Sequence, residues 1–118
     1  MAKYSNMNQF GERIRKLREQ NGTRQRELAA LLETDSAYIS KLENGERKAK
    51  REQVLLLAGF FKVDKEELLS LWLGGKVYDV LKNEDVAKQA LKVAEKNIDI
   101  NKKNKSKNGK NGYRYSSR

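Results

Sequence analysis

Apolar residues recur every three or four positions over most of residues 1–100, and they rarely alternate with polar ones. This spacing is that of one face of an α-helix, whereas a half-buried strand would show alternation. The chain also contains no proline, the residue that most strongly interrupts helices. The pattern therefore predicts an all-α fold.

The first part of the chain is expected to form helices at residues 8–21, 24–32, 36–43, 51–61 and 64–73. Gly22 is expected to end the first helix, and Thr23 is expected to cap the second. Asp35 begins the third helix and Gly45 follows its end. The fourth is expected to bury Val54, Leu55, Ala58 and Phe61.

After the Gly74-Gly75 pair, residues 76–81 are expected to be briefly helical, and Asn83 is expected to cap a last helix. From Asn101 the composition becomes Lys, Asn, Gly and Ser, which cannot bury enough apolar area to offset the entropy of ordering. The expected organisation is a compact domain at 8–73, a helical extension at 76–100 and a disordered basic tail at 101–118.

The charge is unevenly distributed along the chain. The net charge is +10, and residues 101–118 contribute +7 of it, with seven Lys and Arg and no Asp or Glu. A polyanionic partner is indicated, but the body of the chain is only mildly basic. Net charge alone therefore does not identify a nucleic-acid-binding protein.

Several classes of function are disfavoured by what the sequence lacks. Without His or Cys, the usual zinc sites, disulfides and Ser-His-Asp catalysis are not available. No Gly-rich phosphate loop is present, and no apolar run approaches the ~18 residues that span a bilayer. The start of the chain has no secretory signal pattern. We expect a cytoplasmic protein that is not an enzyme and has neither a cofactor nor a metal ion.

The segment that begins at Thr23 reads TRQRELAALLETDSAYISKLENGERK. Gln25 opens its first expected helix, Ile39 and Leu42 lie on the core face of the next, and Glu43-Asn44-Gly45 follow. Over residues 10–72 these features resemble the Cro and phage-repressor (XRE-type) family of helix-turn-helix domains. The resemblance implies a five-helix repressor-type bundle, here with a C-terminal helical extension, that binds operators as a symmetric dimer.

A recognition helix that enters the major groove presents short or polar side chains at its start and buries its opposite face. The third expected helix has this character, because its polar positions are set against Ile39 and Leu42. The candidates for base contacts are Ser36, Ala37, Ser40 and Lys41.

The candidates for contacts with the DNA backbone surround the same surface. Gln25 lies at a helix N-terminus, where free N–H groups and the helix dipole favour a phosphate. The full set is Gln25, Arg26, Tyr38, Asn44, Arg47, Lys48, Lys50 and Arg51. The family resemblance assigns phosphate contacts to Gln25 and Asn44 and implies a buried ion pair between Arg18 and Glu43.

The turn between the two helices departs from the family pattern. The family prefers glycine there, because glycine adopts positive φ freely, and this chain has Glu33. We expect the substitution to cost on the order of 1 kcal/mol.

Two apolar segments exceed what one small core needs. Leu68, Leu71, Trp72 and Leu73 are expected to be shared between the core and a dimer interface, since Trp is enriched at interface hot spots. The stripe at residues 86–98 packs on its own domain, pairs with a second copy or binds a partner protein, and pairing with a second copy is favoured over the other two roles.

The sequence as a whole predicts a transcriptional regulator, a repressor or a controller, that binds palindromic double-stranded DNA as a homodimer. Controller proteins of restriction-modification systems, phage repressors and antitoxins are all similar in size and organisation. The alternative is an antitoxin-like interaction protein, whose residues 86–98 bind a protein partner while the chain autoregulates its operon.

Overall fold

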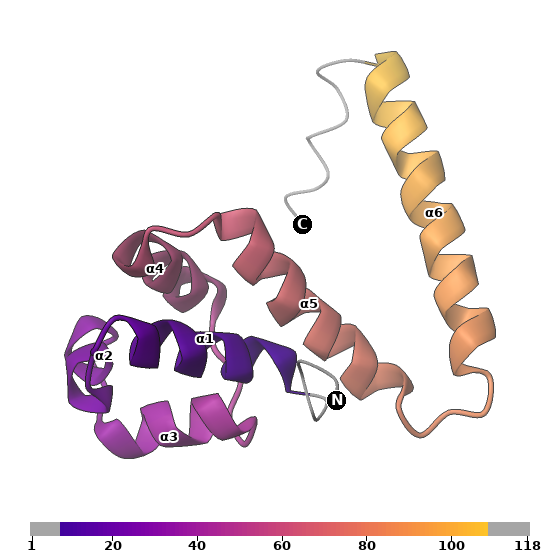
Figure 1. Ribbon diagram of the computed structural model, residues 1–118. Helices are drawn as coiled ribbons and strands as arrows, with labels where there is room; N and C mark the ends of the chain where they lie inside the picture. Colours follow the sequence, from indigo (N-terminus) through magenta and orange to yellow (C-terminus); the bar gives the residue numbers. More distant parts are fainter. Residues whose placement is uncertain (1–7, 109–118) are drawn as a thin grey trace. The chain divides into compact units, whose positions relative to one another are not determined.

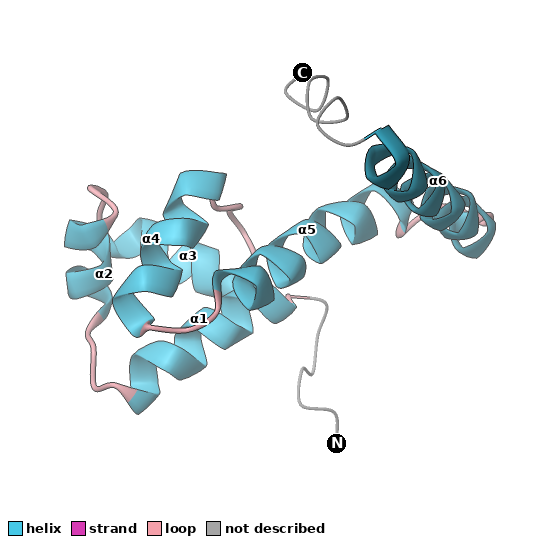
Figure 2. Cartoon of the chain, turned by 90° about the horizontal axis from the view of Figure 1, so that it is seen from above, coloured by secondary structure: helices cyan, strands magenta, loops and turns pink. Residues whose placement is uncertain are grey.

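The computed structural model describes residues 8–108, with side chains to residue 105. In this range the chain forms six helices and no strand, which confirms the predicted all-α class (Figures 1 and 2). The helices are α1 (Gln9–Gln20), α2 (Gln25–Leu31), α3 (Ser36–Asn44), α4 (Arg51–Phe61), α5 (Lys65–Leu81) and α6 (Ala87–Asn108). They belong to two compact units, one ending at Asp79 and the other beginning at Val80.

Local capping explains where the first helices begin and end. The Asn8 side chain accepts a hydrogen bond from Gly11 N, and the Asp35 carboxylate accepts one from Tyr38 N at 2.8 Å. Both satisfy N–H groups that have no partner inside the helix. Gly45 follows α3 with φ 85°, which suits glycine because it has no Cβ.

The predicted cap of α2 is wrong by one residue. Arg24, not Thr23, precedes the helix, and its backbone N–H donates to the Glu27 carboxylate at 2.7 Å. Thr23 instead lies in the turn after α1, where its backbone N–H donates to the Arg18 carbonyl at 2.9 Å.

The core of the first unit is built from one face of each of α1 to α5. α3 packs against both α1 and α2, and α1 also contacts α4. The largest fully buried side chains are Ile14, Leu28, Ile39, Leu42, Leu57, Leu68 and Val54. In α4 the prediction was wrong for Leu55, which is exposed. Leu57 takes its place, because positions 54, 57, 58 and 61 share one helical face.

The predicted dimer-interface set divides between the core and the surface. Leu68 is fully buried, and Trp72 is only 6% exposed, with its indole N–H donating to the Ala49 carbonyl at 2.8 Å. These two residues belong to the core of their own unit, so of the shared role that was expected for them the structure has the core part, and neither side chain is exposed at a surface. Leu71 is half-buried and Leu73 is exposed.

The predicted break at Gly74-Gly75 does not occur, and α5 continues to Leu81. A glycine inside a helix costs about 1 kcal/mol relative to alanine, which favourable neighbours offset. The ion pair between Lys48 Nζ and Asp79 Oδ2, at 2.6 Å, binds this part of α5 to the segment before α4; its side chains are 50% and 38% exposed, so it contributes at most about 1 kcal/mol. Residues 76–79 therefore belong to the first compact unit and not to the extension.

Helix α6 begins later and ends later than expected. It starts at Ala87 instead of directly after Asn83, and it continues to Asn108, so residues 101–108 are helical and not disordered. Lysine has good helix propensity, and its positive charge is favourable near a helix C-terminus. The remainder of the predicted tail, residues 109–118, lies outside the described residues.

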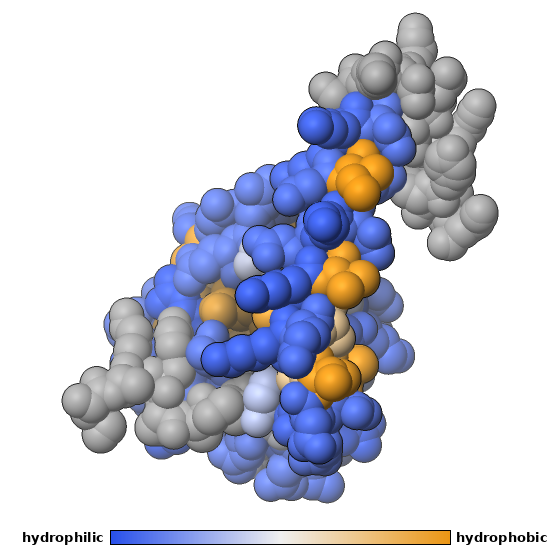
Figure 3. All heavy atoms as spheres, turned by 90° about the vertical axis from the view of Figure 1, so that its right-hand side faces the viewer, coloured by the Kyte–Doolittle hydropathy of each residue, from blue (hydrophilic) through white to orange (hydrophobic). Residues whose placement is uncertain are grey.

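Apolar side chains also remain at the surface, where they stand among hydrophilic ones (Figure 3). The larger ones are Leu55, Leu56, Phe60, Leu73, Val77, Tyr78, Val80, Val86, Leu91, Val93, Ile98 and Ile100. Within the described residues, no helix combines the length and the apolar character needed to cross a membrane.

Gly11 allows α1 and the end of α3 to approach closely. A Cβ built at this position would lie 2.6 Å from both the Leu42 and the Glu43 carbonyl oxygens. These are backbone atoms, so relief requires a shift of one helix against the other. The absence of a side chain here sets the distance between the two helices.

Replacing Gly11 with alanine is expected to destabilise the domain by about 1–3 kcal/mol through overpacking. The matched control is Gly59→Ala in α4, where a new Cβ meets nothing within 4 Å. That change is expected to be neutral or to stabilise by about 0.5–1 kcal/mol, because alanine favours the helix. Thermal unfolding followed by circular dichroism measures both variants, and equal melting temperatures would contradict the packing argument.

Candidate nucleic-acid interface

The turn between α2 and α3 has the geometry that the sequence predicted. Glu33 has φ 57°, in the left-handed region that favours glycine. The N–H groups of Glu33 and Thr34 donate to the Ala30 and Ala29 carbonyls, at 3.2 and 2.8 Å. The turn therefore ends α2 in the expected way, although the left-handed conformation is energetically unfavourable for Glu33.

Helix α3 has one buried and one exposed face. Ile39 and Leu42 are 1% and 2% exposed. Ser36, Ala37 and Lys41 are exposed and Ser40 is half-buried. At about 100° per residue, the predicted base-contact residues share one side of the helix, and Asn44 extends it.

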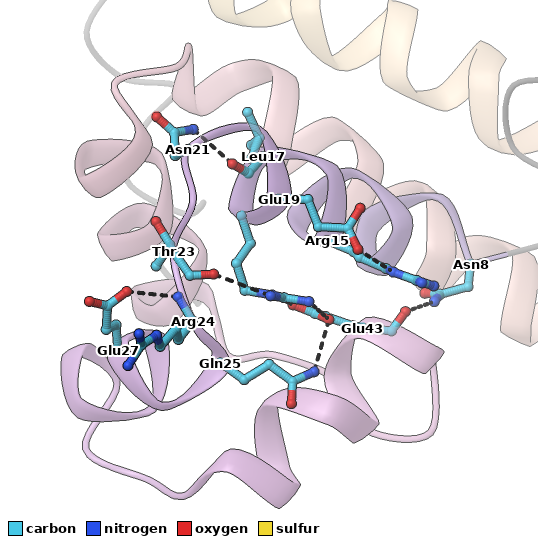
Figure 4. Close-up of polar contacts among 11 residues, drawn as sticks. Asn8, Arg15, Leu17, Glu19, Asn21, Thr23, Arg24, Gln25, Glu27 and Glu43 are labelled. Atoms are coloured by element: carbon cyan, nitrogen blue, oxygen red, sulfur yellow. Dashed lines mark hydrogen bonds and ion pairs between the residues drawn. The ribbon is translucent and has the colours of Figure 1, made fainter.

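Glu43 joins α3 to the rest of the domain (Figure 4). Arg18 on α1 donates to both of its carboxylate oxygens, from Nε to Oε2 at 2.6 Å and from Nη2 to Oε1 at 3.1 Å. Gln25 Nε2 on α2 donates to Oε1 at 3.2 Å. The Glu43 carbonyl also accepts from Asn8 Nδ2 at 2.6 Å. The predicted ion pair is present, and it is part of a network that spans three helices.

The same network also affects the pKa of Arg18. The hydrogen bond to Glu43 raises the pKa of the Arg18 guanidinium above its usual value, against burial, which lowers it. A raised pKa means that the stabilising contribution of Arg18 is lost only when the pH rises into a strongly alkaline range. Arg18 Nη1 also donates to the Thr23 carbonyl at 3.2 Å, so the same guanidinium fixes the start of the turn before α2.

All of the predicted backbone-contact residues except Gln25 and Tyr38 are exposed, among them Arg26, Asn44 and Lys50. Gln25 is half-buried and engaged with Glu43, as described above. The others, Tyr38, Arg47, Lys48 and Arg51, each make a contact within the protein.

A family model described as a helix-turn-helix domain matches residues 9–71, which is more than half of the chain. The chain belongs to this helix-turn-helix family. The predicted family is thereby confirmed, and the chain is a DNA-binding helix-turn-helix regulator, a class that is typically not enzymatic.

Among solved structures, the chain is similar to the restriction-modification controller protein C.AhdI from Aeromonas hydrophila, a high-resolution crystal structure. The two are 32% identical in sequence, the match covers 58% of this chain and 99% of that one, and the TM-score is 0.47. A comparison with curated proteins finds no match.

Tyr38 positions the loop after the recognition helix of the helix-turn-helix domain. Its hydroxyl donates to Gln53 Oε1 at 2.9 Å, and the same oxygen accepts from Lys50 N at 2.9 Å. The Arg47 guanidinium lies 5.5 Å from the centre of the Tyr38 ring. Gln53 was missed by the sequence reasoning. Its signal was its place three residues after Lys50, where a Gln reaches back to the start of a helix.

Lys48 and Arg51 are tied to α5. Lys48 forms the ion pair with Asp79, and the Arg51 guanidinium lies 5.5 Å from the centre of the Trp72 ring. The Lys76 ammonium lies 4.0 Å from the same ring. In this basic segment, the charge of Lys48 is therefore partly neutralised by Asp79, and the Arg51 side chain is held against α5.

Replacing Arg18 with alanine is expected to cost about 3–5 kcal/mol of unfolding free energy, because Glu43 is left charged and buried. Its side chain is only 3% exposed in the native pair. The control is Arg15→Ala, which removes an ion pair to Glu19 whose side chains are 54% and 55% exposed. The resulting destabilisation is expected to be below about 1 kcal/mol. Urea denaturation measures both, and similar effects would mean that burial of the Arg18 pair is unimportant.

Replacing Glu33 with glycine is expected to stabilise the domain by about 1 kcal/mol, because the left-handed conformation no longer strains a Cβ. Glu33→Ala keeps the Cβ and serves as the control, with no comparable gain. The midpoint of urea denaturation reports the difference. If alanine stabilised as much as glycine, side-chain effects and not backbone strain would be responsible.

Proposed function

We propose that the chain is a sequence-specific regulator of transcription that binds a palindromic operator in double-stranded DNA as a homodimer. The observation that carries the proposal is the pair of faces on α3. Its polar face is exposed from the first turn onward, and its apolar face and Glu43 are anchored in the domain. A rigid helix with a free polar face is what the major groove accepts.

The exposed face of α3 offers chemistry suited to base edges. Lys41 donates to guanine acceptors, the Ser36 and Ser40 hydroxyls donate or accept, and the Ala37 methyl packs on a thymine methyl. A good contact of this kind supplies about 1–3 kcal/mol of discrimination against the wrong base. The four residues together support recognition of a short half-site.

Residues around this face supply contacts to phosphates. The first turn of α2 presents backbone N–H groups near Gln25 and the exposed Arg26, and Asn44 at the end of α3 and Lys50 before α4 are also exposed. Arg47, held over Tyr38, adds a fixed positive charge. Such contacts set affinity and register and carry no sequence information.

Action as a dimer is supported by an apolar face on α5. Leu73 and Val77, one helical turn apart, are 43% and 45% exposed, and the half-buried Leu69 continues the same stripe. In a symmetric dimer the two recognition helices would read half-sites about 34 Å apart. Occupation of an operator by such a dimer would act on a promoter by exclusion or by recruitment.

Selection of bound duplexes from random DNA tests the proposal. The full chain is expected to enrich a site with two inverted half-sites separated by about one helical turn. Enrichment of a single, non-repeated half-site would remove the homodimer from the proposal. A pool with no enriched sequence would overturn sequence-specific binding altogether.

Replacing Lys41 with alanine is expected to relax base preference at one position of each half-site and to weaken binding to the preferred sequence by about 1–3 kcal/mol. Lys50→Ala is the control, because removing an ammonium group that binds a phosphate weakens binding to all sequences alike and flattens the salt dependence. Fluorescence anisotropy with preferred and scrambled duplexes at several salt concentrations separates the two. If Lys41→Ala weakened binding to both duplexes equally, its assignment as a base reader would be contradicted.

A further inference from the structure

Helix α6 has an apolar half and a charged half. At about 100° per residue, its apolar residues up to position 100 fall within about 180° of the helix circumference. They are Ala87, Ala90, Leu91, Val93, Ala94, Ile98 and Ile100. The ionisable residues of the same stretch, Lys88, Lys92, Glu95, Lys96 and Asp99, occupy the other half. This separation is typical of a helix that buries one side.

The centre and the borders of the apolar half differ in side-chain size. Ala87, Ala90, Ala94 and Asn97 follow one another at alternating spacings of three and four, the spacing of a coiled-coil seam. Larger residues border this seam, with Leu91 and Ile98 along one side and Val93 and Ile100 along the other. Small residues at the centre let a second helix approach closely, and the larger ones then close over it.

The large residues of this face are uncovered in the chain. Leu91, Val93, Ile98 and Ile100 are 48%, 60%, 57% and 52% exposed. An apolar stripe of this width on a helix in water is normally covered by another element. We therefore expect another helix or protein surface to bind this apolar face of α6.

We propose that α6 pairs, parallel and in register, with α6 of a second copy of this chain. The polar end of the seam identifies the occupant, because at the same spacing Asn97 is followed by Asn101 and Asn104. In a parallel pair Asn97 faces Asn97 of the second copy, and each amide both donates and accepts a hydrogen bond. An antiparallel pair would place the asparagine end of one seam against the alanine end of the other, where the amides have no partner. Polar residues in a seam are a known means of fixing register and orientation.

Charge is compatible with a second copy. The seam carries no ionisable residue up to Ile100, so two identical faces meet without repulsion. Repulsion is confined to the lysine-rich end, where Lys102, Lys103 and Lys105 of both copies come together. Salt screens such exposed charges, so the parallel pair is expected to strengthen as ionic strength rises. An antiparallel pair would bring these lysines to Glu84 and Asp85 and would weaken instead.

The pairing rests on the proposed function, since it specifies how two copies come together on one operator. The chain enters both helices of a parallel pair from the same end, so both helix-turn-helix domains are attached at that end. This suits two half-sites on one face of DNA. The surface on α5 is separate, so pairing through α6 can fail while DNA binding remains.

Cysteine cross-linking of the full-length chain, without DNA, tests the pairing, because the natural sequence contains no cysteine. Ala90→Cys places a thiol in the seam, where its counterpart in the second copy comes within disulfide distance. Lys92→Cys is the matched control on the charged half. Under mild oxidation, Ala90→Cys is expected to form a covalent dimer at least about tenfold faster than Lys92→Cys, because pairing raises the local thiol concentration. Equal rates would overturn the parallel arrangement.

Sedimentation of the full-length Ala94→Glu variant gives a second test. Two facing carboxylates in the seam are expected to raise the dimer dissociation constant about 100-fold or more. Lys92→Glu, on the charged half, is expected to leave it within a few-fold. An unchanged dimer in Ala94→Glu would assign self-association to another face and overturn the pairing. A natural chain that is monomeric would also overturn it. In that case α6 binds its own domain, a lipid vesicle or another protein. Half-site binding measured on the same variants reports the proposed DNA function independently.

Discussion

The buried ion pair between Arg18 and Glu43 is the contact on which the position of the recognition helix depends. Glu43 lies at the end of α3, and its carboxylate receives hydrogen bonds from α1 and α2 at once. A buried pair contributes little net stability compared with apolar residues of the same size, but it accepts only one geometry. The three helices are therefore held in a fixed arrangement.

A second constraint is the close approach between the start of α1 and the end of α3. Gly11 leaves room for the carbonyls of Leu42 and Glu43, and Asn8 caps α1 while donating to the Glu43 carbonyl. Both contacts act on the same end of α3 as the ion pair. The recognition helix is thus fixed at its C-terminal end, and its first turns remain exposed.

Basic residues near the interface have structural as well as electrostatic roles. Arg47 lies over Tyr38, Lys48 pairs with Asp79, and Arg51 lies over Trp72. These contacts restrict long side chains whose conformational freedom is otherwise large. The number of lysines and arginines in the sequence does not describe this arrangement.

The helical class, the helix-turn-helix segment and the unusual turn can be predicted from the sequence alone, because they depend on local spacing, capping and backbone preference. Asp35 caps a short helix, Gly45 ends it, and the spacing of Ile39 and Leu42 gives it one apolar face. Glu33 adopts the expected positive φ. The tertiary structure decided which apolar residues are covered and where the longer helices end. Trp72 belongs to the core because it packs against other buried residues and donates a hydrogen bond to the Ala49 carbonyl. Helix α5 continues through Gly74-Gly75, and its residue Asp79 forms an ion pair with Lys48. Contacts between residues far apart in the chain outweigh local propensities of about 1 kcal/mol, and no local pattern records them.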